Sequence, residues 1–141
     1  MKNRIVFAFL SAITLTAQAG ISTSSIGPGD RYYVSDRALW SNCVLYGRVF
    51  VPNLPYGMTS AEAKKKAINT STPKKGRAIV IAASKWWHIA VVDAVDDSGK
   101  SRSLTLVEAN YKSGQLTRRK VTCSNSLDGC LKEAKILGFI K

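Results

Sequence analysis

The sequence is poor in the residues on which several classes of protein depend. It contains one histidine and three cysteines, and two of these cysteines lie close enough in the chain to pair. This leaves too few histidines and thiols for a zinc site. The sequence has no internal repeat, and no apolar run in it is long enough for a membrane span. These absences argue against a zinc enzyme, a repeat protein and a membrane-spanning protein.

Acidic residues are also scarce, which makes the chain strongly cationic. Nine acidic residues stand against 21 basic ones, giving a net charge of +12. Such an excess favours polyanionic partners: nucleic acid, anionic lipid or an anionic cell-wall polymer. The basic clusters at residues 64–66, 74–75 and 118–120 form no recognised nucleic-acid motif. The lysine run at 64–66 has two interpretations, a solvated helix face or a binding motif, and the first is favoured.

Residues 1–19 have the pattern of a secretory signal peptide. Lys2 and Arg4 precede a short apolar run at residues 5–15, and Ala17-Gln18-Ala19 is an A-x-A cleavage site. An uncleaved N-terminal anchor is the alternative. Cleavage near Ala19 lowers the net charge from +12 to +10 and predicts a secreted or periplasmic protein with no stable membrane insertion. Export also argues against nucleic acid as a partner.

The cysteines divide into a pair and a single residue. Export permits disulfides, and Cys123 and Cys130 flank a polar, loop-like segment with Gly129 as a turn residue, so they are expected to pair. Cys43 is then left over. An odd cysteine in a secreted chain indicates intermolecular pairing or a functional thiol, and an inert buried thiol is the third interpretation.

Hydrophobic periodicity predicts one α+β domain over residues 20–141, with helices before an antiparallel sheet of about five strands. Residues 20–34 are predicted to be an irregular lead-in. Ser35, followed by Asp36, is a candidate cap for one helix. Ser41 or Asn42 is a candidate cap for another, which would put Cys43 in a first turn where the helix dipole favours a thiolate.

A further helix is expected from about Thr59 to Asn69, because residues 59–62 read as a capping box. Strands are expected at residues 78–82, 89–95, 103–108, 115–121 and 136–140, with a hairpin turn at residues 96–99.

His88, the single histidine, is the only imidazole base available to Cys43. Glu108 and Asn110 end the neighbouring predicted strand, and alternation puts both on one face. Pairing through the hairpin would bring Glu108 near His88, as a cysteine nucleophile with an oriented base requires. Taken alone, a single histidine is more simply a surface or hydrogen-bonded structural residue.

Five short motifs in this order resemble the CHAP family, the cysteine- and histidine-dependent amidohydrolases/peptidases of the papain-like clan. The resemblance runs from about Tyr32 to Ile140, and its motifs are Asn42-Cys43, Pro73-Lys74-Lys75-Gly76, His88-Ile89-Ala90-Val91-Val92, Glu108-x-Asn110 and Gly138-Phe139-Ile140. It implies a papain-like fold and a peptidoglycan hydrolase, either an N-acetylmuramoyl-L-alanine amidase or a peptide endopeptidase. By resemblance, Cys43 is the nucleophile, His88 the base and Glu108 the orienting group, with Asn110 as helper or alternative.

The chain departs from the family pattern at three positions. Trp87 stands where glycine often precedes the histidine, Leu45 where an aromatic residue is frequent, and Arg77 where an acidic residue is common. Of the pair Trp86-Trp87, at most one residue is expected to line a substrate groove, and Trp87, beside His88, is the candidate for substrate binding. Core packing is the other interpretation. Asn42 and the Cys43 N–H are candidate oxyanion donors.

No metal or cofactor is expected for this chemistry. The expected partner is bacterial cell-wall peptidoglycan, with an inhibitor or immunity protein as a further candidate. A toxin and a housekeeping or phage-type wall hydrolase are both compatible with the sequence. The alternative of another class is a non-catalytic, cationic envelope-binding protein on the same fold, which would bind anionic polymer in a salt-sensitive way.

Overall fold

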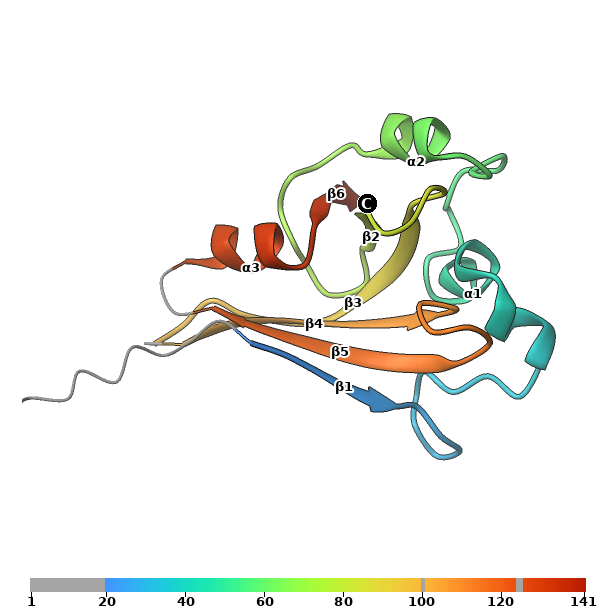
Figure 1. Cartoon of the computed structure of the whole chain (residues 1–141), viewed down its shortest axis with the longest axis horizontal. Helices are drawn as coiled ribbons and strands as arrows, with labels where there is room; N and C mark the ends of the chain where they lie inside the picture. Colours follow the sequence, from blue (N-terminus) through green and yellow to red (C-terminus); the bar gives the residue numbers. More distant parts are fainter. Residues whose placement is uncertain (1–19, 100, 124–125) are drawn as a thin grey trace, which may run out of the picture.

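A computed structural model of the chain describes residues 20–99, 101–123 and 126–141. The predicted signal peptide at residues 1–19 lies outside these described residues. Antiparallel strands form one sheet in the order β1-β5-β4-β3-β2-β6 (Figure 1). In chain order the elements are β1 (Gly20–Ser25), the 3₁₀ helix η1 (Arg37–Ser41), α1 (Cys43–Phe50), α2 (Ala61–Ala67), β2 (Ala78–Ile81), β3 (His88–Asp96), β4 (Arg102–Ala109), β5 (Leu116–Cys123), α3 (Leu127–Glu133) and β6 (Ile136–Ile140).

The α+β architecture predicted from the sequence is confirmed: α1 begins at Cys43 and packs on a six-stranded antiparallel sheet. The five predicted strands are all present, and the sixth is β1, in a segment predicted to be irregular. Its side chains are all exposed, so it carries no alternation of apolar and polar residues. Backbone pairing with β5, from Gly20↔Thr122 to Ser25↔Thr117, holds β1 in place. Such pairing leaves no trace in the sequence pattern.

Two helices start around Cys43 in succession, as predicted, but the first is a 3₁₀ helix that is capped by Asp36 and not by Ser35. The Asp36 side chain accepts a hydrogen bond from the Ala38 N–H and caps η1. Asn42 then accepts from the N–H groups of Val44 and Leu45 and caps α1. Cys43 is therefore the first residue of α1, as the second predicted start requires.

The α2 helix is shorter than predicted, and its cap is one residue later. Ser60, and not Thr59, accepts from the Ala63 N–H, so the predicted capping box does not form. The helix ends at Ala67 because the following residues join the sheet edge: the N–H groups of Asn69 and Thr70 both donate to the carbonyl oxygen of Phe139 in β6. This competing backbone pairing ends the helix before Asn69.

Two apolar clusters cover opposite faces of the sheet, because side chains alternate along each strand. Val80, Ile89, Val91 and Val107 face α1, whereas the neighbouring residues of the same strands form the second cluster. The α1 helix approaches β3 closely at Gly47, where an added Cβ would lie 3.1 Å from Ile89 Cγ2. Gly47 lies one turn after Cys43, so this close approach sets the distance between the start of α1 and the start of β3.

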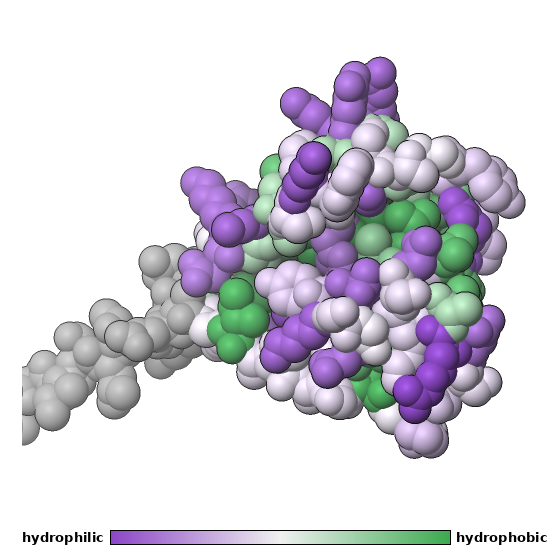
Figure 2. All heavy atoms as spheres, turned by 45° about the vertical axis from the view of Figure 1, so that its right-hand side comes forward, coloured by the Kyte–Doolittle hydropathy of each residue, from purple (hydrophilic) through white to green (hydrophobic). Residues whose placement is uncertain are grey.

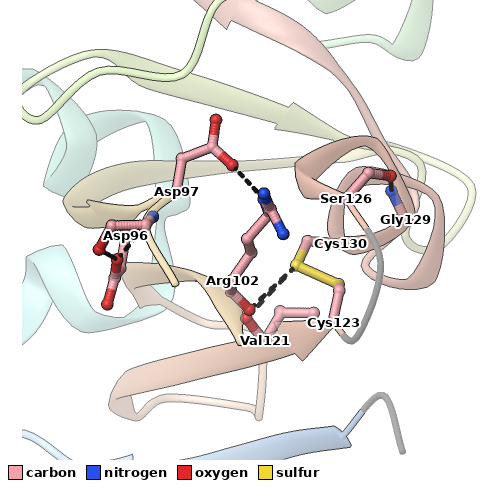
Figure 3. Close-up of polar contacts among 9 residues, drawn as sticks. Asp96, Asp97, Arg102, Val121, Cys123, Ser126, Gly129 and Cys130 are labelled. Carbon is pink, nitrogen blue, oxygen red and sulfur yellow. Dashed lines mark hydrogen bonds and ion pairs between the residues drawn. A yellow bond between two sulfur atoms is a disulfide. The ribbon is translucent and has the colours of Figure 1, made fainter. Parts of the chain in front are cut away.

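The segment between the paired cysteines contains a helix where the sequence indicated a polar loop. In α3 the Ser126 hydroxyl accepts from the N–H of Gly129, which is helical and not a turn residue. A disulfide joins Cys123 at the end of β5 to Cys130 in α3, as predicted (Figure 3). Cys130, Ala134 and Val121 pack together beside it. The cross-link therefore fixes α3 on the sheet face opposite α1.

No helix in the described ranges is both long and apolar enough to cross a bilayer.

Candidate active site

Cys43 is the free cysteine of the described residues, and it lies at the N-terminus of α1, partly buried. The His88 imidazole and the backbone of Ile89 are close enough to its thiol to act on its pKa. Burial, the largest single effect, raises the pKa of the Cys43 thiol, but His88, the Ile89 backbone and Lys64 together outweigh it. The net result is a lowered pKa, so the thiolate is favoured at this position.

His88 is the first residue of β3 and is buried. Burial, the largest single effect, lowers the pKa of His88, but its interactions with Cys43 and Glu108 together outweigh that effect, and the pKa is raised. Its Nε2 atom lies 2.9 Å from Oε2 of Glu108, which leaves Nδ1 as the ring nitrogen available to the thiol. The opposite shifts of the two pKa values are those expected for a thiolate–imidazolium pair.

The turn before β3 positions His88. Two residues of this turn have backbone conformations that are rare except in glycine. Ser84 and Trp87 both have positive φ, +61° and +54°, in the left-handed region that costs a residue with a Cβ about 1–2 kcal/mol. The φ of Trp87 gives a physical reason for a glycine before the histidine in the CHAP pattern. In this chain the indole of Trp87 packs against the core cluster that faces α1.

Glu108, near the end of β4, is fully buried and has two partners. One oxygen of its carboxylate meets His88, and Arg119 of β5 binds both oxygens, through Nε to Oε1 and through Nη2 to Oε2 at 3.0 Å. The arginine is 3% exposed, and its guanidinium lies 3.7 Å from the ring centre of Tyr111. Tyr111 in turn contacts the His88 ring edge-on. Arg119 therefore fixes the carboxylate that His88 contacts, and shares its Oε2 atom with His88.

The sequence interpretation missed Arg119, because it grouped this residue with its neighbours as one basic cluster. A signal was present: alternation along β5 puts Arg119 on the same face as Val121 and Cys123, which are both buried. Glu108 also ends an apolar run, and a carboxylate that is buried in such a strand needs a counter-charge. Together these two facts identify Arg119 as a residue of the site.

Asn110 lies at the edge of the site, but it does not contact His88. It follows the last residue of β4 and has a φ of +63°, so the strand alternation that was expected to align it with Glu108 stops before it. Its amide group donates to the Ser41 carbonyl oxygen at 2.9 Å and accepts from the Gly114 N–H. Asn110 therefore ties the end of β4 to the residues before Cys43.

A cleft of about 440 Å³ opens at Cys43, a size typical of small-ligand sites. It is lined by residues 41–45, Arg48, residues 56–59, Lys64, Trp86 and Asn110. Figure 2 brings the α1 side of the molecule forward and shows green hydrophobic surface in a hollow bordered by more hydrophilic side chains. Cys43 thus lines an open cleft, whereas His88 and Glu108 are buried.

Of the two tryptophans, Trp86 lines the cleft, whereas the sequence interpretation had assigned Trp87 to substrate binding. Trp86 is 58% exposed. The reason for the difference is that residues 84–87 form a turn and not the start of a strand, so simple alternation did not apply to them. The expectation that at most one of the two lines the groove agrees with this arrangement.

The lysine run at residues 64–66 is not uniformly solvated. Lys65 and Lys66 are exposed, but Lys64 is 3% exposed, and its Nζ donates to the Trp86 carbonyl oxygen at 2.9 Å. Lys64 also lines the cleft. The interpretation of the run as a surface face is therefore wrong for Lys64.

Asn42 and Cys43, whose amide groups are the predicted oxyanion donors, both line the cleft. The Oδ1 atom of Asn42 is occupied by its cap bonds to Val44 and Leu45, so only its amide nitrogen is left to donate. The Cys43 N–H, in the first turn of α1, makes no hydrogen bond within the described part of the chain. Both groups line the cleft beside the thiol.

No cluster of three or more metal-binding side chains occurs within residues 20–99, 101–123 and 126–141. Comparison of the chain with protein-family models, curated proteins and solved structures finds no match.

Proposed function

We propose that this protein is a secreted cysteine hydrolase that cleaves amide bonds of bacterial peptidoglycan. The observation that carries the proposal is the linear arrangement of Cys43, His88 and Glu108, with the thiol at a helix N-terminus and facing an open cleft. This is the combination of nucleophile, base and orienting group that covalent acyl transfer requires. The sequence resemblance to the CHAP family supplies the substrate class.

The proposed reaction begins with attack of the Cys43 thiolate on the carbonyl carbon of the scissile amide. The oxyanion that forms would accept hydrogen bonds from the Cys43 N–H and the Asn42 amide. The His88 imidazolium then donates its proton to the leaving amine, and the C–N bond breaks to give a thioester. Water, deprotonated by neutral His88, attacks the thioester and releases the acid and the thiol.

The buried pair of Glu108 and Arg119 has a supporting part in this scheme. Glu108 holds the ring of His88 by Nε2 and favours its protonated form. Arg119 binds both carboxylate oxygens and so restricts Glu108 to one orientation. The carboxylate thus acts on the base and does not touch substrate.

The test is incubation of the purified protein with peptidoglycan, followed by mass spectrometry of the released fragments. Wild-type protein should release fragments, and Cys43→Ala and His88→Ala should release none. Val49→Ala is a matched control, since Val49 lies on the same helix and is exposed. New free N-terminal alanine together with intact glycan indicates an amidase, and cleaved peptides indicate an endopeptidase. Identical release by wild type and Cys43→Ala would exclude the proposal.

The second candidate is a cationic envelope-binding protein without catalysis, which the charge of the chain favours. It predicts that binding to wall polymer weakens with salt and is unchanged by Cys43→Ala. A protein that binds walls in this way and releases no fragment would support this second candidate.

A further inference from the structure

Lys64 is a buried cation with an incomplete set of partners. Its ammonium group has three N–H donors, and among the described residues it has one acceptor, the Trp86 carbonyl oxygen. No carboxylate of the described residues forms an ion pair with it. A charge that is buried to this extent needs compensation. The Cys43 thiol is close enough for Lys64 to lower its pKa, but the Trp86 carbonyl oxygen is the one hydrogen-bond acceptor of Lys64 among the described residues. The remaining donors are left for a group that enters from the cleft.

The helix that carries Lys64 shows that its burial is specific. Lys65 and Lys66 lie on the solvent side of α2, and Lys66 pairs with Glu62 at the surface. Figure 2 shows long hydrophilic side chains projecting from the top of the molecule, where Figure 1 places α2. Lys64 points the other way, into the cleft that holds Cys43.

The cleft as a whole is cationic. Among the described residues that line it, Lys64 and Arg48 are charged, and none is a carboxylate. The Arg48 guanidinium packs over the Tyr56 ring and donates to the Pro55 carbonyl oxygen, while its buried Nε has no partner. Two cations from two helices, each with unused donors, favour an anionic ligand.

We propose that Lys64 binds a carboxylate of the substrate, so that the cleft selects peptides with a free carboxylate near the scissile amide. This inference rests on the proposed function and narrows its substrate class. In peptidoglycan the group that fits is the α-carboxylate of the glutamate in the stem peptide, which is absent where that residue is isoglutamine. A carboxylate oxygen would complete the donors of Lys64 in a site partly screened from water, where such charge-assisted bonds are strong.

Binding to a catalytically inactive protein tests the inference separately from hydrolysis. Two C-terminally amidated probes are used in the Cys43→Ala protein: N-acetylmuramoyl-L-alanyl-γ-D-glutamyl-L-lysinamide and its D-isoglutaminyl counterpart. They differ in one group, carboxylate against carboxamide. By calorimetry, the carboxylate probe should bind about 10- to 100-fold more tightly, the range expected for a hydrogen bond to a charged group.

Variants at neighbouring lysines identify the group responsible. Lys64→Gln keeps a donor for the Trp86 carbonyl oxygen and removes the charge. The ratio of the affinities for the two probes should therefore fall to about 1. Lys65→Gln removes the same charge from the exposed side of α2 and should keep the preference. Circular dichroism melting checks that both variants are folded.

Equal binding of the two probes by the Cys43→Ala protein, or binding of neither, overturns the carboxylate site. So does an equal loss of preference in both lysine variants, which would reflect net charge alone. Wall hydrolysis by the wild type is measured separately, so none of these binding results decides whether the protein is a hydrolase. A carboxylate preference that depends on Lys64, without any hydrolysis, would keep this site and reject the enzyme.

Discussion

Nε2 of His88 lies 2.9 Å from Oε2 of Glu108, with both side chains buried at adjoining ends of β3 and β4. The contact has two consequences. It directs the other ring nitrogen of His88 toward Cys43, and it raises the pKa of His88 although burial works against this. The reactivity of Cys43 therefore depends on a carboxylate that it does not touch.

Alkylation of Cys43 should be fast at mildly acidic pH. The lowered pKa of Cys43 keeps thiolate present below its ordinary titration range, and the raised pKa of His88 keeps imidazolium present above its own. The ion pair therefore exists between these two limits. Reaction with iodoacetamide at pH 6, followed by mass spectrometry, should be faster in the native protein than in the same protein in urea. His88→Ala should remove the difference, and equal native and unfolded rates would argue against the ion pair.

Glu108→Gln should move the alkaline limit of activity to lower pH. Glu108 raises the pKa of His88, so its neutral replacement lowers that pKa, and the imidazolium is lost at lower pH. The rate at the optimum should also fall by about 10²- to 10⁴-fold, as is usual when the group orienting a catalytic histidine is removed. A kcat/KM profile against pH measures both effects. An unmoved alkaline limb would mean that Glu108 does not act on His88.

Arg119→Met should be far more damaging than the same change at Arg118. Arg119 is the buried partner of Glu108, and removal of one member of a buried ion pair costs about 3–5 kcal/mol. Arg118 pairs with Asp30 and Asp93 in a partly exposed position, where a pair contributes about 0.2–1 kcal/mol. Urea denaturation gives the free energies of unfolding.

The same two variants also separate positioning from bulk stability. At a temperature where both are folded, Arg119→Met should lower kcat and shift the pH profile, whereas Arg118→Met should do neither. Arg119→Lys, which keeps the charge without the two parallel hydrogen bonds, should recover stability better than it recovers kcat. Equal kcat in all three variants would show that Arg119 is only structural.

Removal of the disulfide should weaken the fold and spare the site. Cys123 pairs with Arg102 at one end of β4, whereas Glu108 lies near the other end, opposite Thr117. Replacement of Cys123 and Cys130 by serine should lower the free energy of unfolding by about 2–3 kcal/mol, the loop-closure value for so short a segment. The alkylation rate of Cys43 should not change. A slower rate in the folded double variant would contradict the independence of the two ends of the sheet.

Local sequence patterns were sufficient to predict much of this protein. The helix start at Cys43 follows from the Asn42 cap, and β2 to β6 follow from short apolar or alternating runs. The disulfide follows from two cysteines seven residues apart. In each case the determining interaction lies within a few residues, so that periodicity and capping chemistry are enough.

What the tertiary structure decided depends on contacts between distant segments. The exposed strand β1 forms because its backbone pairs with that of β5. Asn110 does not continue the strand alternation of Glu108, because the chain turns at Asn110 with a positive φ. Arg119 and Lys64 both lie in runs of basic residues, and the sequence does not show which residue of such a run is buried. Burial separates them from their neighbours, because a cation removed from water must meet a specific partner: Glu108 for Arg119, and for Lys64 the cleft beside Cys43.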